Sequence, residues 1–461
     1  MSFKAKKIAV LGAGLSGVLV AKKLFQNGHE VSIIDPGIFL TSEKKKEIWN
    51  LESFSRSKLS AIDIDVQKNV RHRYQKKLPL AIGGLAEFYQ AVSIPFHEKE
   101  FSSWPISKSD LDPFYKQAQE WMNIKPSHEH GNISPLAKKL YHAGKELHKD
   151  PYYHPIAIDF STCRHCSICN QVPCPWDARF SPSLLLQELQ TQGIRVLDRS
   201  LVTAATMKQG KILNIKVTNL ENQKESTIDT DEVIVCAGAL NTPFIIKNIF
   251  SCDFNHIGKN LMLHLLGNVI GFFPKPITSK DHFEKWVSFS SDYFDSNGKV
   301  RGIIQQDQMT GPQRILEYIP GTFPKSLFTK IYDQLTQLLV IVDDESCFEN
   351  QVYEKNGKIC VQYQDQKKDL EKRAFLLKQA KKIIKKSGAL ATITTHGKSI
   401  FHACGTCRMG VNSLDSVVNF EGRVHDRDNL WIADASTFNS SGGVNPSLTI
   451  AANALRIADR I

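Results

Sequence analysis

Residues 7–35, KIAVLGAGLSGVLVAKKLFQNGHEVSIID, decide how the chain begins to fold. The run KIAVL predicts a buried strand, the glycines after it predict a tight turn, and the next apolar stretch predicts a helix closed by Gly28. HEVSIID predicts a second strand that ends in Asp35. Because strand, helix and strand follow in this order, we expect a βαβ unit and a parallel sheet in an α/β domain.

The turn of this unit, GAGLSG at 12–17, has the glycine spacing that is typical of dinucleotide binding. The first glycine permits a tight turn, the second lets the backbone approach a pyrophosphate, and the third lets the helix pack on the strand. A carboxylate after the second strand is placed to meet a ribose hydroxyl. A purely structural glycine turn is the alternative. The nucleotide contacts that we predict in this unit are Gly12, Gly14, Leu15, Ser16, Gly17 and Asp35.

Length and charge set wider bounds on the protein. With 461 residues the chain exceeds one compact core, so two domains are expected. The net charge of +11 comes largely from dispersed lysines, which predict a solvated basic surface and no nucleic-acid partner, since a stacking platform would interleave aromatic residues. Neither a targeting segment nor a transmembrane segment is evident, so we expect a cytoplasmic protein with reduced cysteines, and a peripheral membrane protein is the alternative.

Four cysteines fall within twelve residues of one loop. Cys163, Cys166, Cys169 and Cys174 have the spacing C-x2-C-x2-C-x4-C, followed by proline. Bacterial ferredoxin loops have one residue fewer before the last cysteine. Four thiolates at such spacing suit an iron–sulfur cluster or tetrahedral zinc, and a loop that packs without metal is the third reading.

The C-terminal part carries HACGTCRMG at 402–410, WIADAS at 431–436 and GGVNPSLTIAANAL at 442–455. The last stretch predicts a helix with Asn445 as its N-cap and Pro446 in its first turn. A helix N-terminus carries about half a positive charge, which would favour an anionic group placed against it.

Among the helices expected between the termini, two lie between residues 268 and 388. Residues 369–388 form an amphipathic pattern with apolar positions at Leu370, Ala374, Leu377 and Ile384, typical of a helix that covers a domain. Between about 268 and 365 the pattern favours strands and loops, with one helix near 325–337.

With these motifs in order, the chain resembles the glucose–methanol–choline (GMC) family of FAD-dependent oxidoreductases. The resemblance rests on GAGLSG with its acid, IGGLAEFYQA at 82–91, WPISKSDLDPFY at 104–115, VIVCAGALNTP at 233–243, IGKNLMLH at 257–264 and the C-terminal block. It implies a Rossmann-like FAD-binding domain assembled from discontinuous segments, plus a sheet-containing α+β substrate domain. We expect the FAD domain at 1–95, 180–266 and 400–461, and the substrate domain at 96–179 and 267–399.

The resemblance also implies the parts of the active site. His402 would be the base that takes the hydroxyl proton of an alcohol while a hydride passes to flavin N5, and Asn445 would bind the substrate oxygen. A satisfied core histidine is the alternative reading of His402. Phe88 and Tyr89 stand where some members carry a histidine that binds FAD covalently, so non-covalent FAD is expected. The further FAD contacts implied by the resemblance are Gly83, Gly84, Val202, Ala237, Asp434, Ala435, Asn445 and Pro446.

The expected activity is FAD-dependent oxidation of a sugar, polyol or other alcohol to a carbonyl. Electrons would pass to an acceptor other than NAD(P), such as a partner protein or a quinone, and some bacterial members carry a cluster beside the flavin. A redox-neutral lyase that uses FAD as a scaffold and an electron-relay subunit of a larger complex are the alternatives. Substrate and acceptor are not encoded in any motif quoted above.

Overall fold

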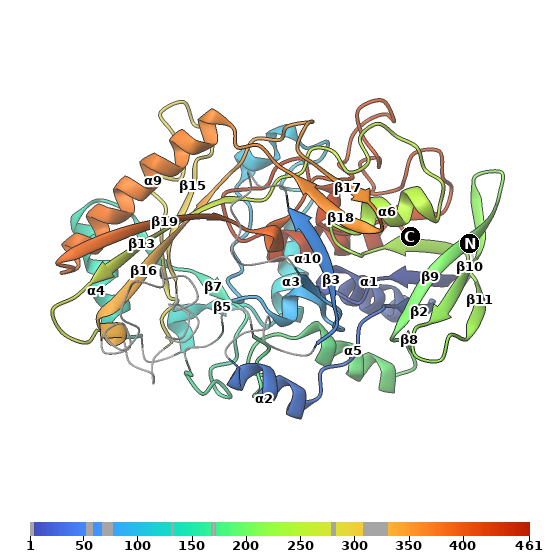
Figure 1. The fold of residues 1–461 in the computed structure, drawn as a ribbon, viewed down its shortest axis with the longest axis horizontal. Coiled ribbons are helices and arrows are strands. Elements are labelled where there is room, and N and C mark those ends of the chain that lie inside the picture. Colours follow the sequence, from blue (N-terminus) through green and yellow to red (C-terminus); the bar gives the residue numbers. More distant parts are fainter. Residues whose placement is uncertain are drawn as a thin grey trace.

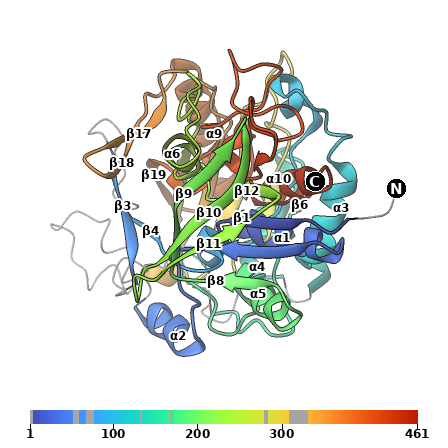
Figure 2. The same cartoon turned by 90° about the vertical axis from the view of Figure 1, so that its right-hand side faces the viewer.

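A parallel five-stranded sheet forms one half of the protein, whose structure here is a computed structural model. The structure describes residues 4–51, 59–66, 77–130, 133–166, 169, 172–277, 283–307 and 331–461. In spatial order the sheet consists of β20 (Leu430–Ile432), β12 (Glu232–Val235), β1 (Lys7–Leu11), β2 (Glu30–Ile34) and β8 (Arg195–Leu197). The α/β class predicted from the first βαβ unit is confirmed, and the sheet gathers strands from both ends of the chain (Figures 1 and 2).

The two faces of this sheet pack against different layers, because successive side chains of a strand point to opposite sides. Ile8 and Val10 of β1 pack against helices, and Ala9 and Leu11 pack toward an antiparallel meander. The helices on the first face are α1 (Leu15–Gln26), α5 (Pro182–Thr191) and α10 (Ser447–Ala458). The meander on the other is made of β9 (Ser200–Lys208), β10 (Lys211–Asn219) and β11 (Glu225–Asp229).

A six-stranded antiparallel sheet forms the other half. Its order is β19 (Ala391–Lys398), β13 (Leu265–Phe272), β16 (Leu335–Val342), β15 (Gly302–Asp307), β14 (Val287–Phe289) and β6 (Pro151–Tyr153). Helix α9 (Lys367–Lys386) lies along one face, as Figure 1 shows. On the opposite face Ile303, Leu339 and Ile341 join the core that also contains residues of β1 and β12, so the two halves share a packed interface.

Helix α9 covers a domain as predicted, but its buried face differs from the predicted one. Leu377 and Ile384 are buried, whereas Leu370 is 37% exposed and Ala374 is exposed. Leu376, Ala380 and Ile383 join the predicted Leu377 and Ile384 on the face that packs against the sheet. This helix contains eight lysines and eight apolar residues, and the two apolar residues nearest its start, Leu370 and Ala374, lie off its buried face.

The helix predicted near 325–337 extends too far at its C-terminal end, because Ile331 is helical but the helix does not continue beyond it. Residues 325–330 lie outside the described residues, and β16 begins at Leu335 after the single turn η5 (Tyr332–Gln334). The run LTQLLVIV pairs on both sides, with β13 and with β15. A strand buried in the middle of a sheet reads as a continuous apolar run, which periodicity cannot distinguish from a buried helix.

The remaining elements connect the halves. A four-stranded sheet joins β17 (Gln351–Lys355) and β18 (Lys358–Gln362) to β3 (Ala61–Val66) and β4 (Lys77–Pro79), and β5 (Lys125–Pro126) pairs with β7 (Pro155–Ile156). The other helices are α2 (Ser42–Asn50), α3 (Asp112–Trp121), α4 (Pro135–Glu146) and α6 (Thr242–Asn248). Short turns are η2 (Gly84–Glu87), η3 (Glu98–Ser103), η4 (Ser127–His130), η6 (Ile400–His402) and η7 (Ala435–Thr437). None of the helices in the described part of the chain is both long and apolar enough to cross a bilayer.

Candidate functional site

The three glycines of the first turn have the three different surroundings that the sequence predicts. A Cβ on Gly12 would lie 2.5 Å from the carbonyl oxygen of Cys236, and the residue has a φ of +110°. A Cβ on Gly17 would lie 1.9 Å from the carbonyl oxygen of Gly12, so only glycine lets α1 approach the turn. At Gly14 a Cβ would meet no protein atom within 4 Å. The middle glycine therefore borders open space, as expected where a pyrophosphate approaches the backbone.

Asp35 follows β2 and lies against the same turn. Its two carboxylate oxygens accept hydrogen bonds from the backbone N–H groups of Ala13 and Gly37, each at 2.7 Å. Burial raises the pKa of Asp35 to about 6, and these two donors oppose the rise. The backbone carbonyl of Asp35 accepts from the N–H of Ser200, which brings the start of β9 and the predicted contact Val202 close to this corner.

The glycine pair of the second motif lies directly beside the first turn. Gly83 forms a parallel bridge with Gly14, and its N–H donates to the carbonyl of Ala13 at 2.8 Å. Gly83 and Gly84 have φ values of +93° and +56°, in the left-handed region that favours glycine. Glu87 at the end of this loop is buried and accepts from the hydroxyl of Ser181 at 2.6 Å.

Asp434 binds together the turns on the other side of β1. It follows β20, and its Oδ2 accepts from the N–H of Gly238 at 2.8 Å and from Oγ1 of Thr242 at 2.6 Å. Its Oδ1 accepts from the N–H of Ser436, so the carboxylate caps η7. Burial raises the pKa of Asp434, and these donors oppose that rise. Asp434 therefore has a structural role as the cap of this turn.

These turns all lie at the carboxyl ends of neighbouring parallel strands. Asp35 follows β2, Gly12 follows β1, Ala237 follows β12 and Asp434 follows β20. In open α/β sheets this edge is where nucleotides bind. Gly238, next to Ala237, also borders open space, because a Cβ there would meet nothing within 4 Å. We call these turns at the carboxyl ends of the strands the cradle. The cradle has room at Gly14 and Gly238, which fits a dinucleotide bound along this edge of the sheet.

His402 ends η6 and reaches toward a second histidine. The Nδ1 atoms of His402 and His264 lie 3.0 Å apart, with the two rings nearly perpendicular. Burial lowers the pKa of His402 well below its usual range, and the neighbouring His264 and Lys285 lower it further. His402 is therefore neutral, as a general base must be before it accepts a proton. Three residues later, the N–H of Gly405 donates to the carbonyl of Ala435 at 3.1 Å, which ties this segment to the cradle.

Asn445 does not cap the last helix, contrary to the sequence-based prediction. The N-cap of α10 is Pro446, no side chain caps the helix, and the helix begins at Ser447. The Oδ1 atom of Asn445 is buried and finds no hydrogen-bond partner among the described residues. Because an unpaired buried oxygen is costly, this amide is available for a ligand. Helix boundaries commonly shift by one residue, but the shift changes the role of this side chain.

The turn before Asn445 is held by a buried carboxylate. Glu100 accepts hydrogen bonds from the N–H of Gly443 and, at 2.5 Å, from the hydroxyl of Tyr293. Burial raises the pKa of Glu100 to about 7. Tyr293 lies between β14 and β15 and Glu100 belongs to η3, so two segments distant in sequence fix the backbone that leads to Asn445.

The cysteine loop lies beside the glycine-pair loop. Arg179 is buried, and its guanidinium donates to the carbonyls of Cys169 and Tyr89, the first at 2.9 Å. Burial raises the pKa of Cys163 to about 11, and repulsion from Cys166 and Cys174 adds to the rise, so the thiols share one neighbourhood. Even so, within the described ranges no three His, Cys, Asp or Glu side chains are arranged to hold a metal ion. The thiols as placed do not form a metal site.

Sequence reasoning missed the residues that position the predicted ones. His264, Asp344, Glu100 and Tyr293 carry no motif role in the sequence analysis, although His264 ends the quoted stretch IGKNLMLH. Its position at the end of that stretch was the only signal. Cys404 and Cys407 are fully buried.

Two family models match the chain, both described as GMC oxidoreductase. One covers residues 92–266 and the other residues 351–454. Among curated proteins, 6'''-hydroxyparomomycin C oxidase of Streptomyces lividus is 23% identical over 520 residues, covering 98% of this chain and 91% of that protein. Paromamine 6'-oxidase of Streptomyces fradiae is 24% identical over 505 residues, with the same two coverages.

Solved structures share the fold at low sequence identity. Pyridoxine 4-oxidase from Mesorbium loti has a TM-score of 0.75 at 17% identity and covers 99% of both chains. A formate oxidase of Aspergillus oryzae RIB40, in a study of FAD modification, has a TM-score of 0.73 at 13% identity and covers 99% of this chain and 98% of that one. The likeness extends over both halves described above.

Proposed function

Because the chain belongs to the GMC oxidoreductase family, we propose that it oxidises an alcohol to a carbonyl compound with FAD as its cofactor. One observation carries the assignment of the site. The segment of His402 is joined to the cradle through Gly405 and Ala435, and His402 itself is neutral and next to His264. Cofactor cradle and base are thus parts of one connected region, as an alcohol-oxidising flavoenzyme requires.

FAD is proposed to lie along the carboxyl edge of the parallel sheet. The open space at Gly14 and Gly238 would take its phosphates, and Asp35 would meet the ribose through lone pairs not used by Ala13 and Gly37. The residues proposed to contact it are Gly12, Gly14, Leu15, Ser16, Gly17, Asp35, Gly83, Gly84, Val202, Ala237, Asp434, Ala435, Asn445 and Pro446. Phe88 and Tyr89 follow the glycine pair, and neither is a histidine, so we propose that FAD is bound non-covalently.

The chain's own residues would handle the proton and the substrate oxygen. His402 accepts the hydroxyl proton, and the amide of Asn445 binds and orients the oxygen from which the proton leaves. Bound FAD supplies the acceptor for the hydride that leaves the carbinol carbon. A neutral imidazole is suited to this task because it has a free lone pair that can take the proton, and burial keeps His402 neutral.

The substrate is proposed to be a primary or secondary alcohol, in the class of sugars, polyols or other hydroxylated small molecules. This is supported by the similarity of the chain to paromamine 6'-oxidase and pyridoxine 4-oxidase, whose names describe oxidation of these two small molecules. A long-chain alcohol is a further candidate substrate, because long-chain-alcohol oxidases of Arabidopsis thaliana are 23–24% identical over about half of this chain.

Turnover with a redox dye tests this function. FAD-loaded protein is mixed with paromamine, pyridoxine or dodecanol and an artificial electron acceptor, and the product is identified by mass spectrometry. We expect at least one alcohol to be converted to its aldehyde or ketone, with two electrons appearing in the dye. Conversion without electron transfer would favour the lyase alternative, and no conversion of any alcohol would favour an electron-relay subunit.

The cysteine loop is proposed separately to hold an iron–sulfur cluster that relays electrons from the flavin to a partner protein or quinone. Its support is the C-x2-C-x2-C-x4-C spacing and the contact of Arg179 with both loops. The thiols would have to rearrange and lose their protons to bind iron. Iron and acid-labile sulfide analysis of protein purified without oxygen tests this. We expect cluster stoichiometry in the wild type and its loss in Cys169→Ser, whereas wild-type protein free of iron would refute the cluster.

We also propose where the protein is located in the cell and how the chain divides into two domains. The expected cytoplasmic location, with or without peripheral membrane contact, is tested by cell fractionation in low and high salt. The division into an FAD domain (1–95, 180–266 and 400–461) and a substrate domain is tested by limited proteolysis. The pairing of β3 with β18 predicts that residues near 61–66 are protected together with the substrate half.

A further inference from the structure

We propose that His264 is a positioning residue that fixes the protonation state of His402, leaving Nε2 of His402 free of a proton and directed to the substrate's hydroxyl group. The proposal rests on the role of His402 as base given above. It concerns a side chain that no motif assigns and that touches neither cofactor nor substrate in the proposed reaction.

The argument begins at the far end of the His264 ring. Its Nε2 lies 2.9 Å from the backbone carbonyl oxygen of Ser441. A carbonyl oxygen only accepts hydrogen bonds, so Nε2 of His264 must carry the proton and donate. In a neutral imidazole one nitrogen is protonated and the other has a lone pair. Nδ1 of His264 is therefore an acceptor.

That acceptor faces Nδ1 of His402 at 3.0 Å. Two lone pairs cannot form a hydrogen bond, so Nδ1 of His402 must be the donor. Neutral His402 then has its lone pair on Nε2, which is the atom that can take a proton. When the hydroxyl proton arrives there, His402 becomes an imidazolium whose Nδ1–H still donates to His264, so the product of proton transfer is stabilised by the same contact.

The arrangement requires His264 to stay neutral. The residue is fully buried, and burial lowers the pKa of its imidazole despite the nearby carboxylate of Asp344. A second proton on His264 would set two N–H groups against each other at the 3.0 Å contact. A buried neutral histidine with one donor and one acceptor satisfied is a stable partner for a base.

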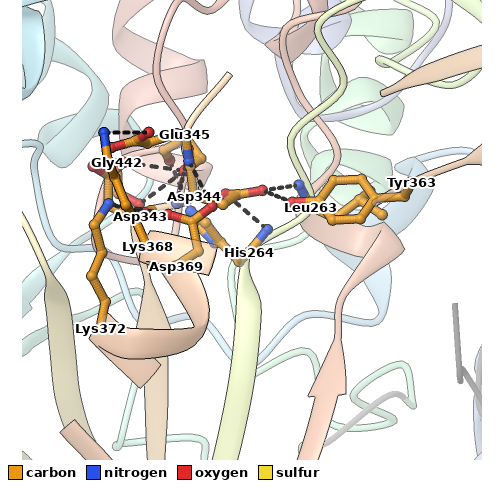
Figure 3. Close-up of polar contacts among 11 residues, drawn as sticks. Leu263, His264, Asp343, Asp344, Glu345, Tyr363, Lys368, Asp369, Lys372 and Gly442 are labelled. Atoms are coloured by element: carbon orange, nitrogen blue, oxygen red, sulfur yellow. Dashed lines mark hydrogen bonds and ion pairs between the residues drawn. The ribbon is translucent and has the colours of Figure 1, made fainter. Parts of the chain in front are cut away.

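The backbone of His264 is fixed by an acidic residue at the end of β16. The carboxylate of Asp344 accepts from the N–H of Leu263 at 2.8 Å and of His264 at 3.2 Å, and from the hydroxyl of Tyr363 at 2.5 Å. Figure 3 shows Asp344 directed at both backbone donors and at Tyr363. Three hydrogen bonds to one buried carboxylate leave the residue little freedom to move.

The partner of His264 is fixed by the same stretch of chain. The N–H of Asp344 donates to Oγ of Ser441 at 3.1 Å, and that hydroxyl lies 3.2 Å from Oδ1 of Asp343. Lys372 of α9 donates to the carbonyl of Asp343 at 2.7 Å, which joins the helix to this corner (Figure 3). The contacts of Asp343 and Asp344 thus fix Ser441, which accepts the hydrogen bond from Nε2 of His264. Ser441 belongs to the segment that leads to Asn445.

Two substitutions separate hydrogen bonding from bulk. His264→Gln keeps one donor for the Ser441 carbonyl and one acceptor for the Nδ1–H of His402. His264→Leu is similar in size and keeps neither. Each protein is loaded with FAD and mixed without oxygen with the alcohol, among paromamine, pyridoxine and dodecanol, that reduces the wild type fastest. FAD content, thermal stability, limiting reduction rate and apparent substrate affinity are measured.

We expect His264→Leu to lower the limiting rate about 10- to 100-fold, the usual effect of losing a partner that orients a reacting histidine, with little change in substrate affinity. His264→Gln should stay within about fivefold of wild type. In a His402→Ala background, adding His264→Leu should cost nothing more, because the residue acts only through His402. A Gln variant as impaired as Leu, or a further loss in the His402→Ala background, would overturn the proposal.

Nitrogen NMR of isotope-labelled histidine rings provides a readout that needs no turnover. The His402 signal, assigned by its loss in His402→Ala, should show a protonated Nδ1 and an unprotonated Nε2, and should change to a mixture of the two forms in His264→Leu. The opposite form in the wild type would overturn the proposal while leaving alcohol oxidation intact. Normal flavin reduction by His402→Ala would overturn the base assignment instead, and this proposal with it. If His264→Leu does not fold, His264→Asn, too short to reach both partners, replaces it with the same expectations.

Discussion

The imidazoles of His264 and His402 meet with their Nδ1 atoms 3.0 Å apart, although 138 residues separate them in sequence. His264 directly precedes β13, the second strand from the edge of the six-stranded sheet, and His402 lies at the end of η6. The contact therefore joins the residue that precedes β13 of the six-stranded sheet to the segment that continues to Gly405 and its bond with Ala435. Changes that disturb this junction should affect chemistry more than binding.

Removing the base should leave the cofactor site intact. His402→Ala is expected to bind FAD normally and to lose about 10²- to 10⁴-fold in the rate of flavin reduction by an alcohol, the usual contribution of general base catalysis. Stopped-flow absorbance without oxygen measures the rate, and His142→Ala, an exposed histidine on α4, is the matched control. A wild-type rate in His402→Ala would remove this residue from its role.

Removing the unpartnered amide should weaken transition-state binding. Asn445→Ala deletes a buried oxygen that has no partner among the described residues, so the variant should be no less stable than wild type. Losing this hydrogen bond should raise the free energy of the transition state by about 1–3 kcal/mol. We therefore expect kcat/KM for the alcohol to fall roughly 5- to 150-fold. Asn222→Ala, on the exposed turn between β10 and β11, should change neither quantity. An Asn445→Ala enzyme with unchanged kcat/KM would show that the amide contacts something other than substrate.

Two glycines of the first turn should respond oppositely to a single methyl group. Gly14→Ala meets no protein atom, so the apoprotein should melt as the wild type does while the dissociation constant for FAD rises at least about tenfold. Gly17→Ala would place Cβ 1.9 Å from the Gly12 carbonyl and should destabilise the fold itself. Differential scanning calorimetry and FAD fluorescence titration measure the two effects. Unaltered FAD affinity in Gly14→Ala would argue that the pyrophosphate lies elsewhere.

Stability should fall as the pH drops below 6.5, in part because of His154. This histidine is fully buried, with its Nδ1 2.9 Å from Oγ of Ser288 and its Nε2 3.1 Å from the carbonyl oxygen of Lys285. Burial, with the nearby charge of Lys285, lowers the pKa of His154 to about 3 from the 6.5 of a free histidine. Between these two pKa values His154 binds a proton in the unfolded chain but not in the folded chain. The free energy of unfolding therefore decreases progressively as the pH falls from 6.5 to about 3.

Between pH 7 and pH 5 this one group should cost about 2 kcal/mol. Urea unfolding of the wild type and of His154→Gln at both pH values measures it, because glutamine keeps a donor and an acceptor but does not titrate. The wild type should lose about 2 kcal/mol more than the variant over this interval. Equal losses in both proteins would show that His154 is already protonated, or solvated, in the fold.

Local sequence patterns were enough to predict the first strand, glycine turn and helix. The strand, glycine turn and helix of β1 and α1 occupy the predicted residues, and Gly12, Gly14 and Gly17 have the surroundings that their roles demand. These features follow from contacts between residues close in sequence, where each residue type has few alternatives. The same is true of the helix at the C-terminus, apart from its cap.

Features that depend on long-range packing could not be predicted. The role of His264 exists only because β13 and η6 come together, and no periodicity or spacing connects them. The predicted helix near 325–337 runs into the first residues of β16, because the strands that pair with β16 on both sides and make it a strand are not adjacent to that run in sequence. Asn445 was placed as a cap because local rules favour it there, whereas the surrounding fold leaves its oxygen without a partner.

The central claim is that both ends of the chain close around one FAD and present His402 to an alcohol. The visible absorbance of protein purified without oxygen, recorded before and after an alcohol is added, tests it most directly. The account predicts an oxidised flavin spectrum, present on purification or restored by added FAD, that bleaches when paromamine, pyridoxine or dodecanol is supplied. A colourless protein that takes up no FAD, or a bound flavin that none of these alcohols bleaches, would contradict it.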